Sequence, residues 1–109
     1  MLNRMVEDDE TLNAVFRALA HTARRSMLRR LVGGQLTVSE LAAPLRMSLT
    51  AASKHVKVLE HSGLIHRTIV GRSHVCRLRP TPLSDAVVWL RIYEQFWDAR
   101  PETSARSLP

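Results

Sequence analysis

The sequence has little of what a catalytic, disulfide-bonded or membrane-spanning protein needs. Its one cysteine, Cys76, cannot close a disulfide within the chain. No apolar run approaches the length of about 18 residues that a membrane-spanning helix requires, and the opening MLNRMVEDDE has no apolar stretch of signal-peptide length. We therefore expect a cytoplasmic protein with no membrane partner.

Catalytic motifs are also missing. Scattered serines, one cysteine and no Gly-rich phosphate loop give no recognisable set of nucleophile, base and orienting acid. The sequence therefore predicts no enzyme and no cofactor.

Acidic residues are scarce in the middle of the chain. Between Thr11 and Ser84 the only acids are Glu40 and Glu60, although the whole chain has 16 lysines and arginines against 10 acids. Such a positive field attracts a polyanion, so nucleic acid is favoured over a surface that is basic merely for solubility. At 109 residues and 45% hydrophobic content, the chain suits a single domain.

Two helices are expected in the first third of the chain. Asp8 or Asp9 can cap the first, whose apolar face has the spacing of successive helical turns: Leu12, Val15, Phe16 and Leu19. Thr22 can cap the second, over 23–32, which ends at Gly33-Gly34 and turns three apolar side chains inward: Met27, Leu28 and Leu31.

The next segment is typical of a helix-turn-helix unit. The run Thr37-Val38-Ser39-Glu40 has the spacing of a capping box, and Pro44 predicts that the helix it begins is short or bent. Ser48 can cap a further helix that ends at Gly63. Only about three residues separate the two helices, as in a helix-turn-helix.

A β-hairpin and a last helix follow. Residues 64–70 and 73–78 read as strands joined by a two-residue type II′ turn at Gly71-Arg72. A helix over 83–99 is closed by Pro101. The predicted fold is mainly α with a β-hairpin wing, a winged helix-turn-helix of order α-α-α-α-β-β-α over residues 1–101, with a disordered tail at 102–109.

The helix over 49–61 has one face suited to a core and another suited to a major groove. Leu49, Ala52, Val56 and Leu59 cluster on one side, and Thr50, Lys54, Lys57 and His61 on the other. Small polar and cationic side chains near its start allow entry into the groove. The candidate DNA contacts here are Ser48, Thr50, Ala51, Ser53, Lys54, His55 and Lys57. Each alone is an ordinary cap, surface residue or solvated charge, and His55 can equally pack beside the helix.

The hairpin adds a basic wing. No acid occurs between His61 and Pro80, and Arg67 and Arg72 are candidate DNA contacts, with Arg72 at the turn placed to reach a minor groove or a phosphate. The alternative is a charged hairpin tip that only keeps the protein soluble.

Aromatic residues are concentrated at the end of the chain, where they exceed what one core needs. The expected dimer interface combines the first and last helices: Leu12, Val15, Phe16, Leu19, Ala86, Trp89, Leu90, Tyr93, Phe96 and Trp97. A homodimer would set two recognition helices about one DNA turn apart, on a pseudo-palindromic site. The alternative is that this stripe packs wholly within one subunit.

Several segments resemble the ArsR (SmtB-like) family of bacterial repressors. The resemblance covers roughly residues 12–97 and depends on Ala20-His21-x-x-Arg24-Arg25, Ser53-Lys54-His55 and Leu59-Glu60-x-x-Gly63-Leu64. It implies that the fourth helix enters the major groove, that the hairpin is the wing and that the terminal helices form the dimer.

The resemblance also raises the question of metal sensing. Arsenic and lead sensors of this family carry Cys-x-Cys where this chain reads Val38-Ser39-Glu40, and zinc sensors carry histidines in the last helix, which has none here. We expect no metal at these sites and Cys76 to be a small strand residue. Two alternatives remain open: a metal-responsive repressor with other ligands, and a winged helix that binds protein. The sequence does not identify an inducer.

Overall fold

The structure, a computed structural model, describes residues 2–98 of the chain. The expected closure of the last helix at Pro101 and the tail at 102–109 lie outside the described residues. None of the helices in the described part is long and apolar enough to cross a membrane.

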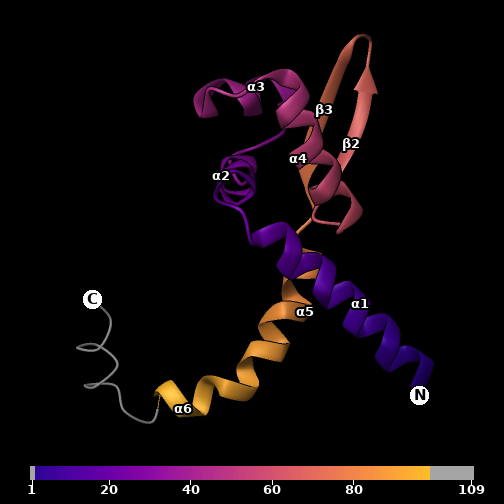
Figure 1. Ribbon diagram of the computed structural model, residues 1–109, viewed down its shortest axis with the longest axis vertical. Coiled ribbons are helices and arrows are strands. Elements are labelled where there is room, and N and C mark those ends of the chain that lie inside the picture. Colours follow the sequence, from indigo (N-terminus) through magenta and orange to yellow (C-terminus); the bar gives the residue numbers. More distant parts are fainter. Residues whose placement is uncertain (1, 99–109) are drawn as a thin grey trace.

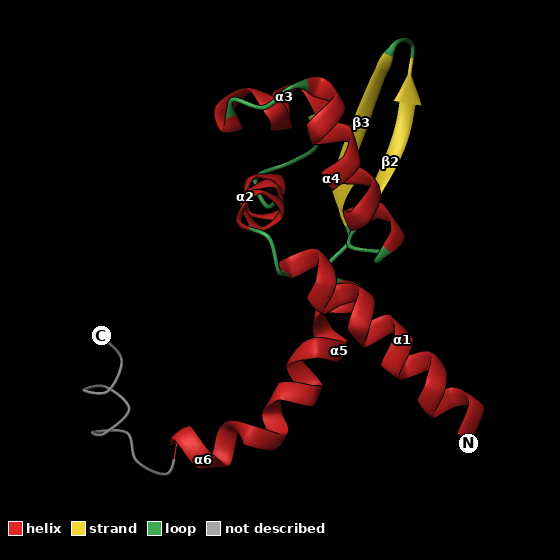
Figure 2. Cartoon of the chain, viewed as in Figure 1, coloured by secondary structure: helices red, strands yellow, loops and turns green. Residues whose placement is uncertain are grey.

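The described chain is mainly helical, with one small sheet (Figures 1 and 2). Its helices are α1 (Leu2–Leu19), α2 (Thr22–Leu31), α3 (Val38–Ala42), α4 (Leu49–His61), α5 (Thr81–Leu90) and α6 (Glu94–Asp98), with 3₁₀ turns η1 (Ala43–Leu45) and η2 (Arg91–Tyr93). Its strands are β1 (Leu36–Thr37), β2 (Ile65–Val70) and β3 (Ser73–Leu78). The predicted fold class, a mainly helical winged helix-turn-helix with a β-hairpin wing, is confirmed.

The core lies where α4 meets α1, α2, α3 and the sheet. The largest side chains that are fully buried there are Met27, Leu41, Leu59, Leu64 and Ile65. The expected inward residues of α2 are buried. α1 also packs on α5, and the two form a stem below the winged part of the molecule (Figure 1).

Local capping chemistry fixes the helix-turn-helix as expected. Both hydrogen bonds of the capping box are present: Thr37 Oγ1 accepts from the Glu40 amide at 3.1 Å, and Glu40 Oε1 accepts from the Thr37 amide at 2.8 Å. Ser48 Oγ accepts from the Ala51 amide at the start of α4, and Gly63, with φ of 81°, follows its end.

Two of the expected helix starts are wrong. The first helix begins at Leu2 instead of a cap at Asp8 or Asp9, because the residues before them include good helix formers and no glycine or proline. The cap of α2 is His21, whose Nδ1 accepts from the Ala23 amide at 3.1 Å, and Thr22 is the first helical residue.

The sheet has a strand that the sequence did not reveal. β1 pairs antiparallel with β3, so the strand order is β1-β3-β2. A two-residue strand has no periodicity to recognise, and its partner lies about 40 residues further along the chain. The hairpin itself is as predicted, and Gly71 has the positive φ, 63°, that the first central residue of a type II′ turn needs.

The last helix is not the single element expected over 83–99. It begins at Thr81, with Pro82 in its first turn, and the 3₁₀ turn η2 separates α5 from α6. Residue 99 lies outside the described residues.

Candidate nucleic-acid interface

The two faces of α4 differ as its sequence pattern predicts, with one exception. Ala52, Val56 and Leu59 have no exposed surface, whereas Thr50, Lys54, Lys57 and His61 are exposed. The prediction that Leu49 lies in the core is wrong, because its side chain is 55% exposed. As the first residue of the helix, it lies at the rim of α4 and lines a hollow instead of the core.

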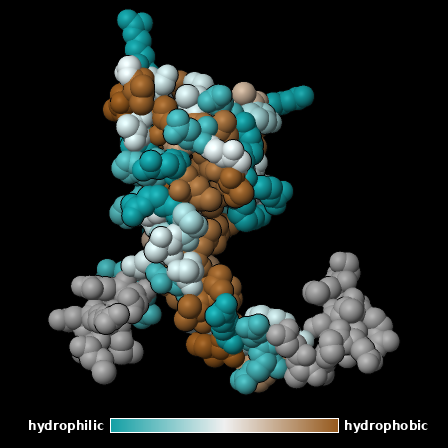
Figure 3. All heavy atoms as spheres, turned by 180° about the vertical axis from the view of Figure 1, so that it is seen from behind, coloured by the Kyte–Doolittle hydropathy of each residue, from teal (hydrophilic) through white to brown (hydrophobic). Residues whose placement is uncertain are grey.

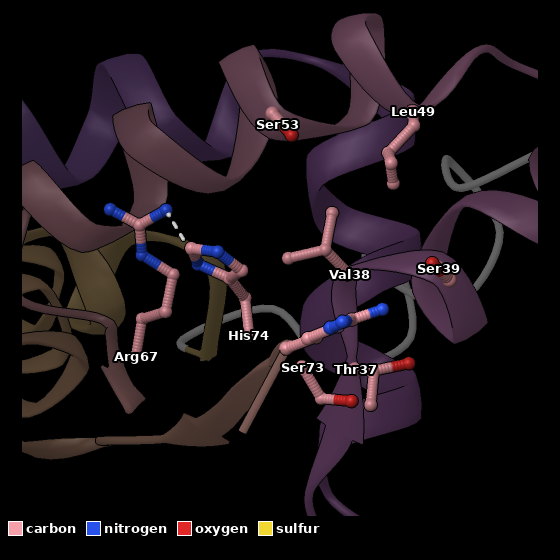
Figure 4. Close-up of a pocket in the computed structure, with 9 residues that line it drawn as sticks. Thr37, Val38, Ser39, Leu49, Ser53, Arg67, Ser73 and His74 are labelled. Atoms are coloured by element: carbon pink, nitrogen blue, oxygen red, sulfur yellow. Dashed lines mark hydrogen bonds between the residues drawn. The ribbon is translucent and has the colours of Figure 1, made fainter. Parts of the chain in front are cut away.

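That hollow, of about 340 Å³, lies between the start of α4, the start of α3 and the hairpin (Figure 4). Its apolar lining is Val38 and Leu49. Hydroxyl groups and cationic or imidazole groups make up the rest: Thr37, Ser39, Ser53, Ser73, Arg67, Arg72 and His74. No carboxylate is among these lining residues. Guanidinium and hydroxyl groups facing one open hollow suit the oxygens of a phosphate.

The side chain of Arg67, a candidate DNA contact, is engaged by other side chains of the protein. Its Nη2 lies 3.1 Å from Glu60 Oε1, and its Nη1 lies 3.4 Å from His74 Nδ1. Its side chain is 24% exposed. Arg67 therefore connects the last turn of α4 to the hairpin, and it lines the hollow from a fixed position.

His55 has protein partners on the opposite side of α4. Its ring centroid lies 4.4 Å from that of His21, and its Nδ1 lies 3.3 Å from Arg24 Nη1. Burial lowers the pKa of His55, and the neighbouring His21 and Arg24 lower it further. His55 is half-buried, so these contacts favour the alternative that it packs beside the helix, and its contact with DNA stays a prediction.

The remaining expected contacts are accessible. Ser48, Thr50, Lys54, Lys57 and Arg72 are exposed, and Ala51 and Ser53 are half-buried along the same rim of α4. At the tip of the hairpin Ile69 and Val70 are exposed beside Gly71-Arg72, 65% and 61% respectively, so the wing tip carries apolar surface that the sequence analysis did not single out.

The stem leaves a large apolar surface uncovered. The rings of Phe16 of α1 and Trp89 pack edge to face with their centroids 5.7 Å apart, and the ring centroids of Trp89 and Tyr93 are 5.2 Å apart. Despite these contacts, α5, η2 and α6 expose eight large apolar side chains to between 40% and 64%: Val87, Val88, Trp89, Leu90, Ile92, Tyr93, Phe96 and Trp97. Figure 3 shows apolar side chains gathered over this lower part of the molecule.

The prediction that Val15 and Ala86 lie in the dimer interface is wrong. Val15 has no exposed surface and Ala86 only 3%, because both lie in the hydrophobic core of one subunit. Leu12, Phe16 and Leu19 are half-buried against the same core and keep part of their surface.

The cysteine lies in the strand position expected for it. Cys76 is fully buried in β3, and this burial raises the pKa of its thiol. Within residues 2–98, no group of three or more His, Cys, Asp or Glu side chains gathers into a metal site.

Known proteins of similar structure are transcription regulators. A crystal structure of an ArsR family transcriptional regulator superposes with a TM-score of 0.77 and 40% identity, over 84% of this chain and 95% of that one. The homodimeric winged helix-turn-helix DNA-binding domain Mb0332 of Mycobacterium bovis, a possible ArsR-family regulator, superposes with a TM-score of 0.68 and 25% identity, over 85% and 88%.

Sequence relatives agree. Residues 19–68 match a helix-turn-helix domain family. The HTH-type transcriptional regulator Rv2034 of Mycobacterium tuberculosis is 41% identical over 69 residues, which is 63% of this chain and 64% of that regulator's length. The transcriptional repressor SdpR of Bacillus subtilis is 29% identical over 79 residues, 72% of this chain and 88% of SdpR.

The fold and the exposed face of α4 define a winged helix-turn-helix protein. With 40% identity to a structure of which it covers nearly the whole length, the chain belongs to the ArsR family of transcriptional regulators. Sequence reasoning missed two contacts: His21 with His55 joins two of the segments that carry the family resemblance, whereas Glu60 with Arg67 joins one of those segments to the hairpin. The family resemblance of those segments was the sequence signal that could have drawn attention to these residues.

Proposed function

We propose that this protein is a DNA-binding transcriptional repressor that acts as a homodimer on a pseudo-palindromic operator. The observation that carries the proposal is the pairing of two surfaces on one chain: a cationic, hydroxyl-rich rim on α4 and the hairpin, and an uncovered apolar stem. Repression is the activity named for SdpR, and homodimerisation that named for the Mycobacterium bovis domain.

In this mode, α4 enters the major groove with Lys54 and Thr50 foremost. A backbone phosphate lies in the hollow between α4 and the hairpin, near Ser53 and Arg72. Arg67 contributes its positive charge from a fixed position in the hairpin. Lys57 approaches the DNA backbone about one helical turn after Lys54 on α4. We assign the protein no catalytic role, no metal or other cofactor, and a cytoplasmic location, where bacterial DNA lies.

The stem is the surface that binds the second copy of the chain. Two stems placed together bury the apolar side chains that each exposes, and the pairing sets two α4 helices on one side of the duplex. The partner surface consists of Leu12, Phe16, Leu19, Trp89, Leu90, Tyr93, Phe96 and Trp97.

The test is fluorescence anisotropy with the duplex upstream of the protein's own gene, repeated over a series of salt concentrations. Lys54→Ala and Arg72→Ala are expected to weaken binding and to reduce the slope of log K against log salt by about one each, as loss of a phosphate contact does. If Lys54 contacts a base, its loss instead relaxes sequence preference and costs about 1–3 kcal/mol.

Arg79→Ala is the matched control, because Arg79 is an exposed arginine at the base of the hairpin, at the opposite end from the turn. It is expected to keep the wild-type slope. Equal losses for Arg79→Ala and Arg72→Ala would reduce the proposal to nonspecific attraction between a basic protein and DNA.

A further inference from the structure

The side chains His21, Arg24 and His55, here called the histidine cluster, connect three helices. Arg24 of α2 donates from Nε to the Ala18 carbonyl at 2.9 Å and from Nη2 to the Arg17 carbonyl at 2.8 Å, at the end of α1. Its third nitrogen, Nη1, lies 3.3 Å from His55 Nδ1 on α4. One guanidinium thus joins the end of α1 to the recognition helix.

The hydrogen bond with Arg24 requires the imidazole of His55 to be neutral. An arginine has only donors, so His55 Nδ1 must accept from Arg24 and cannot carry a proton. His21 is held beside His55, because its Nδ1 accepts from the Ala23 amide at 3.1 Å. Protonation of His55 Nδ1 turns an accepted hydrogen bond into a contact between two donors.

The charges around His55 oppose its protonation. His21 from the turn between α1 and α2 and Arg24 from α2 both face it, and neither is an acid. On α3 and β2, which also pack on α4, Glu40 is engaged with Thr37 and Arg67 with Glu60, and Arg17 of α1 is an exposed cation.

The cluster's own helix adds only positive charge near His55. Its neighbours Lys54 and Lys57 have exposed side chains. A proton on His55 therefore adds a cation beside a guanidinium, with no carboxylate of the described residues to compensate it.

We propose that the histidine cluster is an acid-sensitive support that holds α4 in its DNA-binding position, so that acidification weakens operator binding. His55 is a positioning residue here, one helical position from Lys54 and two from Ser53 at the DNA-facing rim. Loss of the Arg24 contact removes the polar connection between the end of α1 and α4, and α1 is part of the stem that is proposed to bind the second subunit. The inference rests on the proposed DNA-binding function for its readout on DNA.

The sign of the effect follows from linkage. The pKa of His55 is lowered by folding, so the unfolded chain takes up the proton first as pH falls. The contribution of His55 to stability is complete above the unfolded value near 6.5, and it is lost as pH falls from there through the folded value. Exposed histidines act oppositely on DNA binding, because a proton on them adds positive charge toward the duplex.

His55→Asn separates these two effects. The Asn Oδ1 takes the place of Nδ1 as an acceptor for Arg24, and it does not titrate. His66→Asn is the matched control, since His66 is an exposed histidine on the face of the hairpin that points away from α4. Both variants are first compared with wild type by thermal unfolding at about pH 8, where all three are expected to agree.

Duplex affinity is then measured between about pH 8 and about pH 5 at constant ionic strength. Relative to His55→Asn, the wild type and His66→Asn are expected to lose affinity by about fivefold or more over this range, the size of a typical coupling between linked sites. Coincident pH profiles for the wild type and His55→Asn would overturn the proposal.

Denaturant unfolding without DNA keeps the two proposals separate. The wild type is expected to lose stability below about pH 6.5 more steeply than His55→Asn, whatever its affinity for DNA. If no duplex is bound at any pH but this difference appears, the proposed function fails and the acid-sensitive support remains. If the unfolding profiles coincide, the cluster is not acid-sensitive, whether or not DNA binds.

Discussion

Phe96→Ala tests the assignment of the stem as the dimer interface. Phe96 is 63% exposed, on the last described helix. Complete burial of such a side chain is worth about 1.5–3 kcal/mol, so burial of its exposed part contributes about 1–2 kcal/mol per subunit. Each dimer contains two copies, which gives about 2–4 kcal/mol. At about 1.4 kcal/mol per factor of ten, the dissociation constant of the dimer is expected to rise roughly 30- to 700-fold.

Sedimentation equilibrium over a series of protein concentrations measures this constant directly. Val32→Ala is the control, because Val32 is 73% exposed but lies at the end of α2, outside the stem. The control is expected to leave the constant unchanged. A wild-type protein that is monomeric throughout, or a Phe96→Ala variant that dimerises like wild type, would refute the assignment.

Three further predictions concern the core. Leu59→Ala removes a side chain with no exposed surface from the centre of α4, and its free energy of unfolding by denaturant is expected to fall by about 2–5 kcal/mol. Gly63→Ala is expected to destabilise by about 1 kcal/mol or more, because φ there is 81° and the added Cβ comes within 3.3 Å of Pro82 Cγ; a stability equal to wild type would contradict this reading of the turn. The buried Cys76 thiol, with its raised pKa, is expected to react with a thiol reagent only after unfolding, and fast labelling of the folded protein would show that β3 opens.

Elements defined by local chemistry could be predicted from the sequence. The capping box at Thr37, the cap at Ser48 and the glycine at position 63 are short-range signals, and the structure has all three. The turn at Gly71 likewise depends on one residue's backbone conformation. These features place the helix-turn-helix and the wing before any tertiary contact is considered.

Features that depend on distant parts of the chain could not be predicted. β1 exists only through pairing with β3, and the surroundings of His55 depend on residues more than 30 positions earlier. The histidine at the start of α2 is not among the usual capping residues, so Thr22 was favoured. Leu49 is exposed at a hollow that α4 forms with the start of α3 and the hairpin, and a helical wheel of α4 does not contain these neighbours.

The same limit applies to the candidate site. Charge and residue size identified the exposed rim of α4, but they did not distinguish a free arginine from one held by a carboxylate. Arg67 is held by Glu60, and that contact joins the end of the recognition helix to the hairpin. Its role as a partly buried support differs from that of the exposed Arg72.

The most direct test of the central claim is the mass of the protein–DNA complex, measured by sedimentation velocity on the duplex upstream of the gene at increasing salt. The account predicts two protein chains per duplex at low salt, and steep release of both together as salt increases, because several phosphate contacts are lost. A single chain per duplex, or no complex in low-salt buffer, would contradict it.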